Sequence, residues 1–128
     1  MIEALIAGFG GFVGSVGRYA LSMWVTTKLA DETLFPWGTL SVNIIGSIAI
    51  GALVGGIAEL GDLSERMRLL LVVGVLGGFT TFSAFSNETF ALARGGQALM
   101  AFTYVAATLA LSIAAVWAGY SATRAIAS

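Results

Sequence analysis

Four long apolar stretches make up most of this 128-residue chain, and they constrain its fold more than any other feature. A helix needs about 20 mostly apolar residues to cross the hydrocarbon core of a bilayer. The sequence therefore predicts an all-α integral membrane protein, in which residues 1–128 form a single domain of four transmembrane helices. The expected spans cover about residues 4–27, 39–58, 67–93 and 98–122. An even number of spans places both termini on the same side of the membrane.

The composition excludes several classes of function. Hydrophobic residues make up 58% of the chain and charged residues 10%, against roughly 25% charged residues in a soluble domain. The chain has no cysteine and no histidine, so it lacks thiolate chemistry, the usual general base and the commonest metal ligand. A net charge of −1 provides no basic patch for nucleic acid. We expect neither an enzyme nor a nucleic-acid-binding protein. The start, MIEALIAGF, lacks a positive n-region and is interpreted as a retained span, not a signal peptide.

The lysines and arginines in the loops are divided almost evenly between the two sides. Three fall on the side of the termini (Arg66, Arg68 and Arg124) and two on the other (Lys28 and Arg94). Orientation normally follows an excess of these residues on one side. One hypothesis is that the chain inserts in both orientations and pairs antiparallel. The other is that the small bias is enough to establish a single orientation.

Glycine pairs at G-x-x-x-G spacing predict close helix contacts. They occur at residues 10 and 14, 51 and 55, and 74 and 78. Such pairs let two membrane helices approach closely. Three pairs in a short chain indicate a compact bundle, but leave open whether the contacts lie within one chain or between chains.

Among the polar residues inside the apolar stretches, Arg18, Asn43 and Glu88 each have two interpretations. Arg18 either extends to the headgroups or lies at the floor of a water-filled vestibule, where it would attract anions. Asn43 either forms a helix–helix hydrogen bond or donates its amide hydrogens in an anion pathway. Glu88 is either structural, including a place in a vestibule, or coupled to protons.

The segment GGFTTFSAFS, residues 77–86, is unusual for the middle of a membrane helix. Gly77 and Gly78 weaken the helix and predict a break in the third span. A break frees backbone carbonyls, which a bilayer tolerates only where they are buried in protein or line a cavity. Hydroxyls follow that can donate to an anion (Thr80, Thr81, Ser83 and Ser86), along with phenyl rings whose edges carry positive potential (Phe79, Phe82 and Phe85). The alternative is that the hydroxyls bond their own helix and the rings pack in lipid or core.

The fourth span carries a stripe of hydroxyls. Tyr104, Thr108 and Ser112 recur every four residues and share one helix face. Facing the third span, they would form a polar track through an apolar bundle.

At this point the whole chain resembles the Fluc, or CrcB, family of fluoride channels. The resemblance is carried by GSVGRY (14–19), GTLSVNIIG (38–46) and GGFTTFSAFS (77–86) with its following glutamate. It implies an antiparallel, dual-topology homodimer of four-span subunits in the cell membrane, a multi-pass protein of the bacterial inner membrane. Two pores per dimer would export fluoride passively, lower cytoplasmic fluoride and confer fluoride resistance.

The same resemblance implies roles for individual residues. Phe82 and Phe85 match the pore phenylalanines, Asn43 the asparagine at the top of the pore, and Arg18 the vestibule arginine. The backbone carbonyls of Gly77 and Thr80 match those that hold a structural sodium ion (Na+) at the dimer interface. Tyr104, Thr108 and Ser112 match the polar residues of the fourth span. One departure is Ala84, which stands where a hydroxyl is common and leaves Thr81 and Ser83 as the nearer hydroxyls.

Two other classes of protein are compatible with four short spans. A proton-coupled small four-helix exporter needs a membrane-embedded carboxylate, for which the first span offers only Glu3 and the third only Glu88. A membrane subunit without transport activity would need no polar track.

Overall fold

The computed structural model describes residues 1–29 and 34–127, and every regular element in these ranges is a helix. The elements are α1 (Ile2–Leu29), α2 (Trp37–Leu60), α3 (Glu65–Arg68), the π-helix η1 (Leu69–Leu76), α4 (Gly77–Phe79), α5 (Phe82–Arg94) and α6 (Ala98–Ala127). Together they give four segments long and apolar enough to cross a membrane, namely Ile2–Leu29, Trp37–Leu60, Glu65–Arg94 and Ala98–Ala127. The prediction of an all-α chain with four such segments is confirmed.

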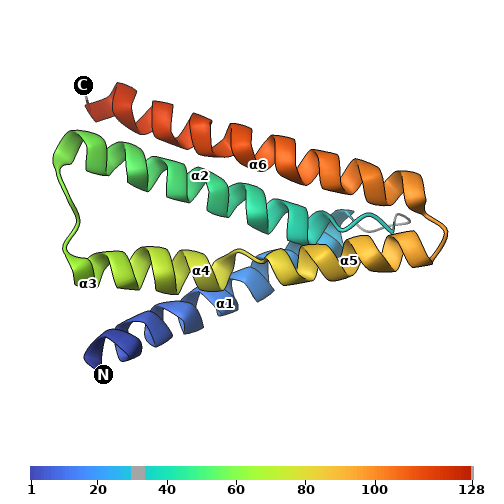
Figure 1. Cartoon of the computed structure of the whole chain (residues 1–128), viewed down its shortest axis with the longest axis horizontal. Coiled ribbons are helices and arrows are strands. Elements are labelled where there is room, and N and C mark those ends of the chain that lie inside the picture. Colours follow the sequence, from blue (N-terminus) through green and yellow to red (C-terminus); the bar gives the residue numbers. More distant parts are fainter. Residues whose placement is uncertain (30–33, 128) are drawn as a thin grey trace.

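The four segments run back and forth along one long axis (Figure 1). Both chain termini and the connection from α2 to α3 lie at one end, and the connection from α5 to α6 lies at the other. The helices α2 and α6 pack side by side along their lengths, whereas α1 crosses the third segment at an angle. We call the end with the two termini the terminal end of the bundle.

Short local signals end and restart the helices. Gly61 follows α2 with φ of 97°, and Gly96 lies between α5 and α6 with φ of 79°. Both values fall in the left-handed region, which glycine enters without a steric cost. Ser64 then caps α3, because its side chain accepts a hydrogen bond of 3.3 Å from the backbone nitrogen of Met67.

Glycines allow the helices to approach closely within this one chain. A Cβ added at Gly10 would lie only 2.9 Å from the Cα of Gly74, where α1 crosses η1. Added at Gly51, it would overlap with the backbone of Val116 on α6. The remaining members of the three glycine pairs make similar contacts, Gly14 with Val75, Gly55 with Tyr120 and Gly78 with Gly11. The structure therefore places all three pairs at contacts within this chain, which the spacing alone left open.

Buried side chains gather near the α5–α6 end. The core cluster contains Leu40, Phe85, Leu92, Ala101 and Tyr104. Many large apolar side chains elsewhere are exposed. Phe12 on α1 and Trp117 on α6 are 68% and 67% exposed, respectively. A surface of this kind suits contact with lipid or with another subunit.

Candidate functional site

The third segment leaves helical geometry at Thr80 and Thr81. Thr80 has φ and ψ of −78° and 158°, and Thr81 has −150° and 119°, both in the extended region. Gly77 keeps helical angles of −64° and −38°, and Gly78 lies with it in α4. The weak point expected at the glycine pair is therefore displaced to the two threonines. The physical reason is that the Thr81 hydroxyl caps a new helix, accepting a hydrogen bond of 3.2 Å from the backbone nitrogen of Ala84.

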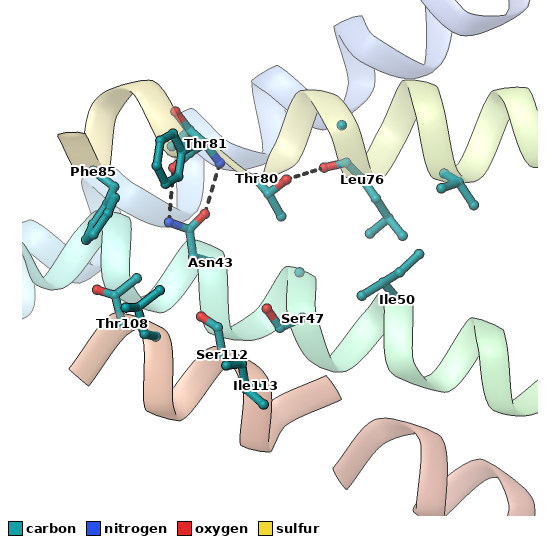
Figure 2. Close-up of a pocket in the computed structure, with 15 residues that line it drawn as sticks. Asn43, Ser47, Ile50, Leu76, Thr80, Thr81, Phe85, Thr108, Ser112 and Ile113 are labelled. Atoms are coloured by element: carbon teal, nitrogen blue, oxygen red, sulfur yellow. Dashed lines mark hydrogen bonds between the residues drawn. The ribbon is translucent and has the colours of Figure 1, made fainter. Parts of the chain in front are cut away.

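Asn43 on α2 holds the extended segment through two hydrogen bonds. Its Oδ1 accepts from the Thr81 backbone nitrogen at 2.9 Å, and its Nδ2 donates to the Thr81 carbonyl at 3.1 Å (Figure 2). An asparagine amide carries two N–H donors. One hydrogen of Nδ2 therefore remains for another acceptor beside the segment.

The interruption frees backbone carbonyls from their helical partners, among them those of Gly77 and Thr80. In an uninterrupted helix, the Gly77 carbonyl would accept from the Thr81 nitrogen and the Thr80 carbonyl from the Ala84 nitrogen. Here those donors bond Asn43 Oδ1 and Thr81 Oγ1 instead. The Thr80 carbonyl accepts from Arg18 Nη1 at 3.5 Å.

The released carbonyls of Gly77 and Thr80 are of a kind that can bind a cation. In residues 1–29 and 34–127, no three His, Cys, Asp or Glu side chains group together as metal ligands. Broken membrane helices can offer unwound carbonyls to Na+. The carbonyl oxygens of Gly77 and Thr80 are ligands of this type, and one chain supplies both.

A pocket of about 480 Å³ opens beside the extended segment, between the third segment, α2 and α6. Figure 2 shows Asn43 and Thr81 at one side of it and Thr108 and Ser112 on the facing helix. Thr108 Oγ1 and Ser112 Oγ are buried, and neither has a hydrogen-bond partner among the described residues. Buried hydroxyls normally have a partner, so these two are available to a polar guest in the pocket.

The two phenyl rings at the pocket differ in environment. Phe85 is 7% exposed and lies 5.3 Å from the Tyr104 ring, measured between centroids. Phe82 lies 5.5 Å from Phe85 but is 77% exposed in the single chain. Phe85 is thus packed within the chain, and Phe82 leaves its ring exposed at the pocket.

Glu88 lies at the centre of a separate buried network near the α5–α6 end. Thr39 Oγ1 donates to Glu88 Oε1 and the Tyr104 hydroxyl donates to Glu88 Oε2, each at 2.7 Å. Tyr104 has no exposed surface. Both carboxylate oxygens are therefore engaged by donors from α2 and α6.

Arg18 faces a second cavity, of about 360 Å³, between α1, α2 and α5. Thr39, Thr81 and Glu88 also line this cavity, so it reaches the extended segment as well. A cation and a carboxylate thus border one space inside the bundle.

The structure brings most of the expected site residues to one place. The 480 Å³ pocket is lined by Asn43, Thr81, Phe82, Phe85, Thr108 and Ser112, together with Gly77 and Thr80. Three others lie elsewhere: Tyr104 in the Glu88 network, Arg18 in the second cavity, and Ser83 on the exposed surface, 3.4 Å from the Thr81 hydroxyl.

Two polar residues on α2 were not predicted from the sequence to take part in the site. Ser47 lines the 480 Å³ pocket, and Thr39 donates to Glu88. Their signal is helical spacing, because Thr39, Asn43 and Ser47 recur every four residues on one face of α2. This stripe is the counterpart of the stripe on the fourth span.

The fold and the site together define a small multi-pass membrane protein with a polar site inside the bundle. Comparison with known sequences is consistent with this class. Residues 5–120 match the family model described as CrcB-like protein, Camphor Resistance (CrcB). The chain belongs to the CrcB family.

Curated relatives match the chain over nearly its whole length. The fluoride-specific ion channel FluC of Agrobacterium fabrum is 50% identical over 125 residues, covering 97% of this chain and 98% of the relative. The proteins of the same name from Rhizobium johnstonii and Rhizobium meliloti are 46% and 44% identical, over 99% and 98% of this chain and 100% and 99% of the relatives.

Proposed function

We propose that this protein is a fluoride-selective channel that lets fluoride leave the cell passively across the cytoplasmic membrane. The observation that carries the proposal is the 480 Å³ pocket, which is lined by two phenyl rings, the Asn43 amide and two buried hydroxyls that have no partner among the described residues. The relatives that match nearly the whole chain are named fluoride-specific ion channels, which supports fluoride as the conducted ion.

The chemistry of the pocket suits a small, strongly hydrated anion that must leave again. Removing water from fluoride requires several replacement donors. The hydroxyls of Thr108 and Ser112, the free amide hydrogen of Asn43 and the edges of two phenyl rings are all neutral. Several weak sites support conduction, because tight binding at a single charged site would slow release.

We further propose that the working unit is an antiparallel homodimer with two pores. The pocket is open on one side of the single chain, and the exposed Phe82 ring lies at it. A second copy would cover this opening and add its own ring. The nearly even charge of the two sides supports insertion in both orientations.

In this dimer, the interruption of the third segment would be the break that the sequence predicts. The backbone carbonyls that it frees would bind a structural Na+. Two copies meeting on a two-fold axis would offer four carbonyls, two from Gly77 and two from Thr80. A carbonyl oxygen has two lone pairs, so the contact of Arg18 with Thr80 leaves one for a cation. Bound there, the ion would supply a fixed positive charge between the two subunits.

The geometry supports proton-coupled export less well than it supports passive conduction of fluoride. Glu88 is the carboxylate inside the bundle, and both its oxygens accept hydrogen bonds of 2.7 Å from buried or partly buried hydroxyls. Both oxygens are thus engaged in contacts that join α2, α5 and α6, whereas a coupled exporter needs its carboxylate free to meet its substrate.

Purified protein in liposomes tests the proposed function. Vesicles loaded with fluoride are diluted into fluoride-free buffer, and efflux is followed with a fluoride electrode. We expect rapid efflux with chloride nearly excluded and no requirement for a proton gradient. Efflux that stops when the proton gradient is collapsed, or protein-containing vesicles as tight as empty ones, would overturn the channel.

A further inference from the structure

An apolar groove, distinct from the two cavities described above, lies at the terminal end of the bundle, away from the proposed fluoride pathway. It has a volume of about 400 Å³ and runs between the first turns of α1 and the start of the third segment. Leu5 and Phe9 line it from α1, and Met67 and Leu70 line it from the third segment. Leu5 and Phe9 are 67% and 65% exposed, so the groove is open to its surroundings.

Arg66 is the charged side chain in the lining of this groove. Among the described residues, Arg66 has no ion-pair partner, whereas Arg124 at the same end pairs with Glu59. The nearby acids Glu3 and Glu65 lie on the same helices but do not line the groove. The groove thus combines apolar walls with one available guanidinium.

The depth of the groove in a membrane follows from the helix bounds. α1 begins at Ile2 and α3 at Glu65, and both starts lie at the terminal end (Figure 1). The ends of spanning segments meet the boundary between hydrocarbon and headgroups. An acyl chain could therefore lie along Leu5, Phe9 and Leu70 while its headgroup reaches Arg66.

We propose that this groove binds one anionic phospholipid, with its phosphate on Arg66 and an acyl chain on the apolar walls. A guanidinium matches phosphate oxygens with two parallel hydrogen bonds. Basic pockets between membrane helices are known to take anionic headgroups. The site does not depend on which ion the protein conducts.

Native mass spectrometry of the purified full-length protein in detergent tests the proposal. Phosphatidylglycerol or phosphatidylcholine is titrated in, and retained lipid is measured. We expect preferential retention of phosphatidylglycerol, reduced about fivefold in Arg66→Gln, as for the loss of one lipid-facing cation. Arg68→Gln removes a cation from the same short helix but outside the groove, and should retain lipid like the unmodified protein.

A second variant tests the apolar walls without changing any charge. Leu5→Trp should fill the groove and lower retention, and Leu99→Trp, at a residue of α6 that is 78% exposed, is its control. Equal retention in Arg66→Gln and Arg68→Gln would overturn the proposal. So would equal retention of the two lipids, or displacement of phosphatidylglycerol by a matched concentration of inorganic phosphate.

Discussion

Asn43 and Thr81 form a two-bond clamp between α2 and the third segment, although 38 residues separate them in the chain. The Asn43 amide takes the backbone nitrogen that would otherwise continue the helix and also contacts the carbonyl of the same residue. The clamp keeps the third segment extended at this point and releases the Gly77 carbonyl, while the Thr81 hydroxyl, by capping α5, releases the Thr80 carbonyl.

Changing Asn43 to Asp tests the clamp. The aspartate retains an acceptor for the Thr81 nitrogen but turns a carboxylate oxygen toward the Thr81 carbonyl, which currently accepts from Nδ2 at 3.1 Å. An unsatisfied buried polar group costs about 1–3 kcal/mol, and the new charge would also repel fluoride. We expect a fall in initial fluoride efflux of at least about tenfold.

Ser47→Ala is the control for Asn43→Asp, since it removes a hydroxyl from the same face of α2 without touching the clamp. It should lower efflux less than Asn43→Asp does. Size-exclusion chromatography verifies that both variants assemble normally. Efflux from Asn43→Asp at the unmodified rate would show that the clamp is not needed for conduction.

Replacing each pocket phenylalanine with isoleucine should separate conduction from folding. Phe85 is buried against Tyr104, so Phe85→Ile should lower both fluoride flux and thermal stability. Phe82 is 77% exposed in the single chain, so Phe82→Ile should lower flux at small cost to subunit stability. The loss of one ring-edge contact, about 1 kcal/mol, corresponds to about fivefold in rate. Unchanged flux in both variants would remove the rings from the pathway.

A pair of glycine substitutions tests the close helix packing. Gly51→Ala would push a methyl group into the Val116 backbone, whereas nothing lies within 4 Å of a Cβ added at Gly8. Overpacking typically costs about 1–3 kcal/mol, and an alanine without a clash favours a helix by up to about 1 kcal/mol over glycine. Thermal unfolding in detergent should rank Gly8→Ala at or above the unmodified protein and Gly51→Ala well below it. The reverse order would contradict the α2–α6 contact.

The Glu88 network predicts a measurable coupling between Glu88 and Tyr104. The Tyr104 hydroxyl donates to Glu88 Oε2 at 2.7 Å, and an intramolecular hydrogen bond contributes about 0.5–1.5 kcal/mol. Tyr104→Phe keeps the ring packing and loses this bond, while Glu88→Leu removes the acceptor at a similar side-chain size. A double-mutant cycle on unfolding free energy should give a coupling of about 0.5–3 kcal/mol. Additive effects of the two substitutions would mean that the bond contributes nothing.

Removing sodium should destabilise the proposed dimer. A ligand that binds only the assembled state at about 100 times its dissociation constant stabilises it by about 2.7 kcal/mol. We expect a lower unfolding temperature when Na+ is replaced by N-methylglucamine at constant ionic strength. The same temperature in both solutions would argue against a cation on the Gly77 and Thr80 carbonyls.

Much of the site could be anticipated from local sequence, because its residues recur at helical spacing in apolar segments. The stripe of Thr108 and Ser112 and the phenyls of α5 are local patterns of this kind. The point of interruption was not anticipated. Propensity favours the glycine pair as the weak point, but the structure keeps Gly77 and Gly78 helical because the capping hydroxyl and the Asn43 amide act on the next residues.

The sequence alone determined that this chain has four spans and that they are helices, because a bilayer leaves backbone groups no partner except one another. It also determined that polar side chains lie within those spans. Only the tertiary structure decided which of them meet. Tyr104 shares a stripe with Thr108, yet its hydroxyl turns to Glu88 while Thr108 borders the open pocket. The physical reason is that helical spacing defines a face of one helix, whereas the partner of each side chain depends on how neighbouring helices cross, and here glycine contacts such as Gly10 with Gly74 set those crossings.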